Sequence, residues 1–319
     1  MHLAHVATFA DRALAGGSAL DGPEEGSWTA RLEGDFGNLR AAFLTATSVG
    51  DTDAALTLVS SLSELAFRRM RYELVHWARA AVEMSDASAH PLRPTVLGVL
   101  AYGAFVRGEL ESAVSLGLEA VELRERLGVP SCGLPERALG NALFYQGRRD
   151  DAIGWIGRHV GAAEENGRVG RLAHGLYMQS VARTSIGDVD GGAVSAEASM
   201  AAAERSASPT ALAQAGYAAG LVAAASSRPD DALVLLERSA ATADSVGNRW
   251  MRAFALTEAM WLRARRGEVE EALAGYRDVV ETWFRGGDWA NQWLSLRHLA
   301  GILASLHRDR EAALLFGAV

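Results

Sequence analysis

Pairs of neighbouring carboxylates are the residues of this chain that most suggest acid–base chemistry. They occur at Asp150-Asp151, Asp230-Asp231 and Glu270-Glu271. Carboxylates placed near a substrate can act as general acid and general base. Each pair, however, follows a turn at the same distance and precedes an apolar segment, where acidic side chains interact favourably with the free N–H groups of a helix start. The recurrence therefore predicts helix starts and no catalytic carboxylates.

Histidine, cysteine and glycine offer no better constellation. His2 and His5 have the spacing of two metal ligands on a helix, but no third ligand lies near them in the sequence. Cys132 is the single cysteine, which excludes an intramolecular disulfide, and no histidine or asparagine in the sequence is an obvious catalytic partner for it. The glycines within residues 161–170 do not follow a strand, so they form no dinucleotide-binding fingerprint. We therefore expect no enzyme activity, no metal and no cofactor.

A recurring turn sets the elements that must position any functional residues. Its copies are separated by 38, 39 and then four times 40 residues. The turn residues are Met70, Gly108, Gly147, Gly187, Ser227, Gly267 and His307. A constant period of this size indicates stacked structural repeats.

Small residues recur in phase with this turn. Seven positions before it the chain has Ser63, Ala101, Gly140, Ser180, Gly220, Met260 and Ala300. Five positions after it the chain has Val75, Ala113, Ala152, Gly192, Ala232, Ala272 and Ala312. Small side chains in register are expected where two helices of a hairpin cross with their backbones close together. Each repeat is therefore predicted to be a helix, a short turn and a second helix.

These repeats predict an all-α, right-handed solenoid of tetratricopeptide-like helix hairpins with a period of about 40 residues. No strand-like alternation competes with this prediction. Residues 1–50 are expected to form an N-terminal helical segment that includes a helix from Trp28 to Ser48. Residues 51–319 are expected to form the repeat superhelix, with an incomplete last repeat.

Composition narrows the classes of partner. The net charge of −8 argues against direct binding of nucleic acid or an anionic membrane. The charge-free run Ser206–Ser227 is long enough to cross a bilayer, but it contains Pro209 and Gln214, and the repeat register explains the same residues. The single cysteine fits a reducing cytoplasm. We therefore expect a cytoplasmic protein that neither crosses membranes nor retards DNA.

The segment WTARLEGDFGNLRAAF, Trp28–Phe43, resembles the stretch W-x-x-x-L-E-x-D-x-x-NLRAAL of large bacterial transcriptional regulators of the LuxR and AfsR types and their adenylate cyclase-linked relatives. The chain end, REAALLFGAV, is also similar to the closing repeat of that family. The matching residues of the first stretch are Trp28, Leu32, Glu33, Asp35, Asn38, Leu39, Arg40, Ala41 and Ala42.

This resemblance covers the C-terminal repeat region of a family that is common in actinobacteria. The family joins these repeats to a signalling ATPase, but this chain contains no G-x-x-x-x-G-K-[ST] phosphate loop. No helix-turn-helix follows Val319 in the sequence. The resemblance therefore implies a sensor or interaction segment that acts with ATPase and DNA-binding domains in cis or in trans, and we expect no ATP binding by this chain.

Aromatic and arginine side chains gather at the positions of the first helices that face the concave surface of tetratricopeptide-like superhelices. They suit the capture of a protein segment or a small effector. The alternative is that the rings pack on one another in a tightly wound superhelix. The residues predicted to contact a ligand are Asn141, Tyr145, His174, Tyr177, Tyr217 and Trp261.

The sequence thus favours a non-enzymatic regulatory module that binds its partner in the concave face. The alternative function is a passive scaffold that mediates self-association or protein–protein assembly. A short last helix with Leu314, Leu315 and Phe316 would leave apolar surface near Trp293 and Leu296. Terminal repeats normally need a polar cap, so we expect either homo-oligomer formation through this end or a longer native chain.

Overall fold

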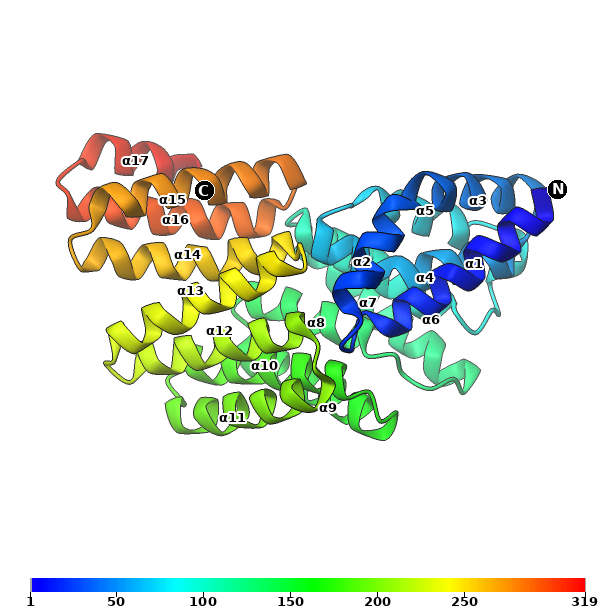
Figure 1. Cartoon of the computed structure of the whole chain (residues 1–319), viewed down its shortest axis with the longest axis horizontal. Helices are drawn as coiled ribbons and strands as arrows, with labels where there is room; N and C mark the ends of the chain where they lie inside the picture. Colours follow the sequence, from blue (N-terminus) through cyan, green and yellow to red (C-terminus); the bar gives the residue numbers. More distant parts are fainter. Residues whose placement is uncertain (1, 319) are drawn as a thin grey trace.

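The chain folds entirely into α-helices joined by short turns (Figure 1). The computed structural model describes residues 2–318, apart from the side chains of residues 2, 3, 85 and 318. No strand occurs among the described residues. In chain order the helices are α1 (His2–Ala19), α2 (Glu25–Gly34), α3 (Phe36–Val49), α4 (Thr52–Arg69), α5 (Glu73–Val82), the 3₁₀ helix η1 (Ser85–Ala87), α6 (Arg93–Val106), α7 (Leu110–Leu127), α8 (Leu134–Tyr145), α9 (Arg149–Glu165), α10 (Val169–Ser185), α11 (Val189–Ser206), α12 (Pro209–Ala225), α13 (Pro229–Ser245), α14 (Arg249–Arg265), α15 (Val269–Gly286), α16 (Trp289–Ser305) and α17 (Asp309–Ala318).

The turn inside each hairpin adopts a left-handed backbone conformation at the residue that the sequence register marks. All seven marker residues have a positive φ, including the non-glycine residues Met70 (57°), Ser227 (59°) and His307 (57°). This conformation is the usual way to end a helix, because it lets the next amides bond to the last carbonyl groups. The predicted register of the turns is confirmed.

The two helices of a hairpin cross where the small residues predicted it. A Cβ atom on Gly140 would lie 2.8 Å from Ile156 and 3.6 Å from the carbonyl oxygen of Ala152. In the hairpin of α10 and α11, the Ser180 hydroxyl donates to the carbonyl oxygen of Gly192 at 2.8 Å. Larger side chains at these positions would push the helices apart.

The acidic pairs occupy the positions that the sequence indicated. Asp150 and Asp151 lie in the first turn of α9, and the other two pairs lie in the first turns of α13 and α15. Arg148 also pairs with Asp151 at 2.7 Å on the exposed surface. These carboxylates serve helix starts, as predicted.

One helix of the N-terminal segment differs from the prediction. The expected helix from Trp28 to Ser48 is broken at Asp35 into α2 and α3. Gly34 and Gly37 flank the break and have low helix propensity, and Asp35 pairs with Arg12 of α1 at 2.5 Å. The same segment contains α1, whose bounds the sequence did not indicate and which packs against α3 and α4.

The superhelix closes on itself. Helix α14 packs against α4, and α16 packs against α6, so repeats far apart in sequence are in contact. The Tyr72 hydroxyl donates to Asp288 at 3.0 Å. A Cβ atom on Gly108 would lie only 2.5 Å from the ring of Trp293. Figure 1 shows the ends of α13 and α14 reaching the N-terminal helices.

The charge-free segment Ser206–Ser227 contains all of α12, which packs against α10, α11 and α13. Among the described residues, no helix is long and apolar enough to cross a membrane.

Candidate functional site

A groove of about 640 Å³ lies between the first helices of successive hairpins. Helices α8, α10, α12, α14 and α16 line most of it, with Phe105 from α6 and with Arg149 and Ile156 from α9. Its volume lies within the range of about 300–1,000 Å³ that is typical of ligand pockets. The aromatic residues that line it are Phe105, Phe144, Tyr145, Tyr177, Tyr217, Trp250 and Phe254.

The 40-residue period of the sequence builds the wall of this groove. Tyr177, Tyr217 and Arg297 stand ten positions before their turn markers, on α10, α12 and α16. Val181 and Leu221 stand six positions before their markers, one helical turn further along the same faces. Equivalent positions of stacked repeats therefore meet on one surface.

The lining rings also pack on one another. The ring centroids of Tyr177 and Tyr217 are 6.0 Å apart, and those of Tyr217 and Phe254 are 4.9 Å apart. Tyr177 is only 5% exposed and Tyr217 only 2%. The hydroxyl groups of these two tyrosines make no hydrogen bond with any residue in the described part of the chain. The rings therefore pack on one another and also line a groove, so the two alternatives predicted for them occur together.

Glu258 is the acidic residue of the groove. It lies on α14, one helical turn after Phe254, and burial raises its pKa from 4.5 to about 7. Arg149 and Arg297 line the same groove, and neither forms an ion pair within 4 Å in the described structure. The groove therefore combines apolar walls with unpaired groups of both charges.

Sequence reasoning missed Glu258 because its position, nine residues before the turn marker, is not among those expected on the concave face. A signal was nevertheless present. Glu258 is the one acidic residue between Arg249 and Arg265, in the segment RWMRAFALTEAMWLRAR. An acid placed alone among apolar residues is a candidate for binding.

Four of the six predicted contact residues line the groove, namely Asn141, Tyr145, Tyr177 and Tyr217. The Tyr145 hydroxyl donates to the side-chain oxygen of Asn291 on α16 at 2.9 Å, so this residue also links distant repeats. Whether the four contact a ligand stays a prediction.

His174 and Trp261 do not share that surface. The ring of Trp261 lies 5.5 Å from that of His298, over Gly301 of the neighbouring first helix. His174 lines a separate, small cavity of about 20 Å³, which has room for about one water molecule. The prediction that all six residues lie on one surface is therefore corrected for these two.

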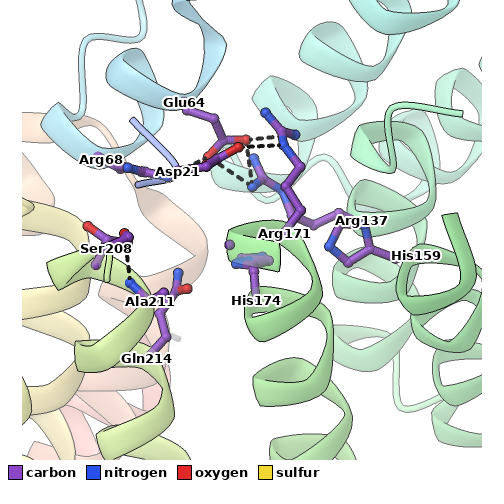
Figure 2. A pocket seen from close by; sticks show the side chains of 12 residues that line it. Asp21, Glu64, Arg68, Arg137, His159, Arg171, His174, Ser208, Ala211 and Gln214 are labelled. Atoms are coloured by element: carbon purple, nitrogen blue, oxygen red, sulfur yellow. Dashed lines mark hydrogen bonds and ion pairs between the residues drawn. The ribbon is translucent and has the colours of Figure 1, made fainter. Parts of the chain in front are cut away.

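That small cavity belongs to a buried ionic cluster, shown in Figure 2. Glu64 pairs with Arg137 at 3.0 Å and with Arg171 at 3.3 Å. Asp21 pairs with Arg68 at 3.0 Å and with Arg171 at 3.1 Å. These pairs join the N-terminal helices to α8 and α10, so the cluster fixes the relative position of distant segments.

The histidines of the cluster are neutral. Burial, together with Arg137, lowers the pKa of His174 well below its usual value of 6.5. Burial likewise lowers the pKa of His159 to about 3. Neither histidine ring lines the groove, and the small cavity beside them is lined by the ion-paired side chains. We interpret this cluster as structural.

No group of three or more histidine, cysteine or acidic side chains that could hold a metal ion occurs among the described residues. The side chain of His2 lies outside them, so the His2–His5 pair is not described. Cys132 is free and accepts a hydrogen bond from the Thr95 hydroxyl at 3.3 Å.

The C-terminal end carries exposed apolar side chains. Leu314 is 67% exposed, Phe316 56% and Trp293 42%, whereas Leu296 and Leu315 are partly buried. Helix α17 spans Asp309–Ala318 and is shorter than the second helices α11, α13 and α15. Its role in self-association remains a prediction.

Comparisons with known proteins identify the same fold. No family model matches the chain, and no curated protein matches its sequence. A solved structure of a Rap protein complexed with Competence and Sporulation Factor is similar, with a TM-score of 0.65 and 10% identity over 98% of this chain and 96% of that chain. Aspartyl phosphate phosphatase F from Bacillus subtilis is similar with a TM-score of 0.60 and 15% identity over 77% of this chain and 64% of that chain. The predicted all-α solenoid of tetratricopeptide-like hairpins is confirmed at the level of the fold.

Proposed function

We propose that this protein is a non-enzymatic regulatory module that captures a segment of another protein in the groove. The observation that carries this proposal is the groove itself, which is about 640 Å³ in volume and lined by aromatic rings from successive repeats. Rigid aromatic side chains provide contact area at a low entropic cost. Glu258, Arg149 and the hydroxyl groups of Tyr177 and Tyr217 have no partner among the described residues, so they can fix the orientation of the bound segment.

An extended segment suits the groove better than a small effector does. Most of the lining residues come from the successive first helices α8, α10, α12, α14 and α16, so binding sites for several side chains lie in a row. The similar Rap structure is itself a complex, with Competence and Sporulation Factor. That complex supports the idea that a superhelix of this kind can hold a partner.

The regulatory context of the proposal rests on the sequence. The resemblance of Trp28–Phe43 to LuxR-type and AfsR-type regulators favours a role in controlling an ATPase and DNA-binding domain, in cis or in trans. In this role the chain carries the recognition surface, and the other domains carry ATP and DNA chemistry.

The proposal can be tested by blocking the groove. Leu221→Trp places a large ring in the groove, whereas Val234→Trp places the same ring on the exposed side of α13 as a matched control. Wild-type protein should enrich peptides from an immobilised random peptide library. Those peptides should bind Val234→Trp normally and lose at least about tenfold in affinity for Leu221→Trp, which corresponds to about 1.4 kcal/mol. Equal binding to both variants, or no enrichment, would refute the proposal.

A second candidate function, a self-associating scaffold, is favoured by the exposed Leu314 and Phe316. Under this alternative, replacing both by Asp would convert an oligomer to a monomer in analytical ultracentrifugation. A wild-type chain that sediments as a monomer would remove this candidate.

A further inference from the structure

The carboxylate of Glu258 stands without a partner in the wall of an aromatic groove. It forms no hydrogen bond and no ion pair within residues 2–318, as far as side chains are described. Trp250 and Phe254 lie on the same helix at intervals of four residues, so they share its groove-lining face. Tyr217 lines the groove from α12.

Glu25 and Glu64 are buried acids of this protein, and both have donors. Glu25 accepts hydrogen bonds from the Ser208 hydroxyl at 2.7 Å, from the Thr210 amide at 2.9 Å and from Arg68 at 3.0 Å. Glu64 pairs with two arginines. A buried carboxylate needs such donors, because desolvation of its charge is otherwise not offset. Glu258 is only partly buried and lines the groove, so its carboxylate is accessible to a donor that enters the groove.

The surroundings of Glu258 favour a positively charged group on the ligand. The faces of tryptophan, tyrosine and phenylalanine rings attract cations, and a carboxylate among them adds a direct ion pair. An anion or an apolar group would leave the carboxylate desolvated and unpaired. Arg149 and Arg297 line the groove but lie beyond 4 Å from Glu258. They are therefore free to meet an anionic group elsewhere on the same ligand.

We propose that the groove binds a segment with a cationic group, a lysine or arginine side chain or a free α-amino group, which sits on the Glu258 carboxylate between the rings of Tyr217, Trp250 and Phe254. This inference rests on the proposed function of the groove. It adds the chemical class of the ligand and the residue that selects it.

The test uses the full chain and an immobilised random heptapeptide library with free and with acetylated N-termini. Peptides enriched by the wild-type protein should carry a basic residue or require the free α-amino group. Glu258→Gln should weaken their binding on the order of 10- to 100-fold, the usual effect of losing a charge-assisted hydrogen bond. Glu271→Gln, which removes an exposed carboxylate on α15, serves as the matched control and should bind like the wild type.

A third variant separates ligand recognition from an internal ion pair. The alternative is that Glu258 forms an ion pair with Arg297 inside the protein and does not contact the ligand. In that case Arg297→Gln should weaken peptide binding as much as Glu258→Gln does. We expect Arg297→Gln to retain the preference for basic peptides.

The outcomes distinguish this inference from the function on which it rests. Peptides that require an open groove but lack a cation, or that bind Glu258→Gln as tightly as the wild type, refute the cation site and leave the groove proposal intact. Peptides that bind Leu221→Trp as tightly as the wild type, or a library from which no peptide is enriched, refute both the cation site and the proposed function of the groove. Basic peptides that lose affinity for Glu258→Gln and keep it for Glu271→Gln support the inference.

Discussion

The sharpest prediction from this structure concerns the stability of the variant Glu258→Gln. Burial raises the pKa of Glu258 from 4.5 to about 7, so the folded state holds this proton more tightly than the unfolded state does. The stability of the wild-type protein should therefore fall as the pH rises from about 4.5 to about 7 on account of this group. Glutamine has no such charge, so the variant lacks this loss.

The size of the effect follows from the two pKa values. The difference between 4.5 and about 7 corresponds to about 3 kcal/mol of lost stability once the carboxylate is ionised. Because Glu258 faces the groove, water screens part of that charge, and we expect Glu258→Gln to be more stable than the wild type by about 1–2 kcal/mol at pH 8. At pH 4 both side chains are neutral and the difference should be close to zero.

Urea denaturation of the ligand-free protein at pH 4 and pH 8 measures this difference directly. Asp288, whose pKa burial raises from 3.8 to about 6, titrates in the wild type and the variant alike, so its contribution cancels. Tyr145, Tyr177 and Tyr217 stay neutral in this pH range, because burial raises their pKa. Arg149 and Arg297 also line the groove and are the same in both proteins. A variant that is less stable than the wild type at pH 8 would refute the environment inferred for Glu258. A difference in the free energy of unfolding that is the same at pH 4 and pH 8 would refute it as well.

The remaining predictions concern the contacts between distant repeats, the groove, and the binding of ATP and DNA. Glu25→Ala should lower the free energy of unfolding by about 3–5 kcal/mol, because it leaves the buried Arg68 short of a partner; calorimetry that finds a loss below about 1 kcal/mol would contradict this. Tyr145→Phe removes the hydrogen bond to Asn291 and should cost about 0.5–1.5 kcal/mol in urea denaturation. Tyr177→Ala should lower stability by about 3–5 kcal/mol, as truncation of a buried ring does; an unchanged melting temperature with lost peptide capture would mean that this ring only contacts ligand. Purified protein should neither hydrolyse ATP nor retard duplex DNA at physiological salt, because the chain lacks a phosphate loop and is acidic; a saturable ATPase that survives further purification would oppose this expectation.

Much of the fold could be predicted from the sequence because contacts within a hairpin are local. The turn residue and the small residues around it lie within about 12 positions of one another, and they recur in every repeat. The turns at Met70, Ser227 and His307 could be located although none of these residues is glycine, because the period determines their place, and the structure shows that each has a positive φ. The same period placed Tyr177 and Tyr217 on one wall.

The tertiary structure alone decided which turns of the superhelix meet. Contacts such as Tyr72 with Asp288 join residues 216 positions apart. They depend on the sum of small rotations between successive repeats, which no single repeat encodes. Those rotations carry Trp261 onto His298 although it shares its register position with Leu221 of the groove. They also leave Glu258 alone among aromatic rings, because its surroundings come from helices whose spacing in the sequence does not fix their distance in space.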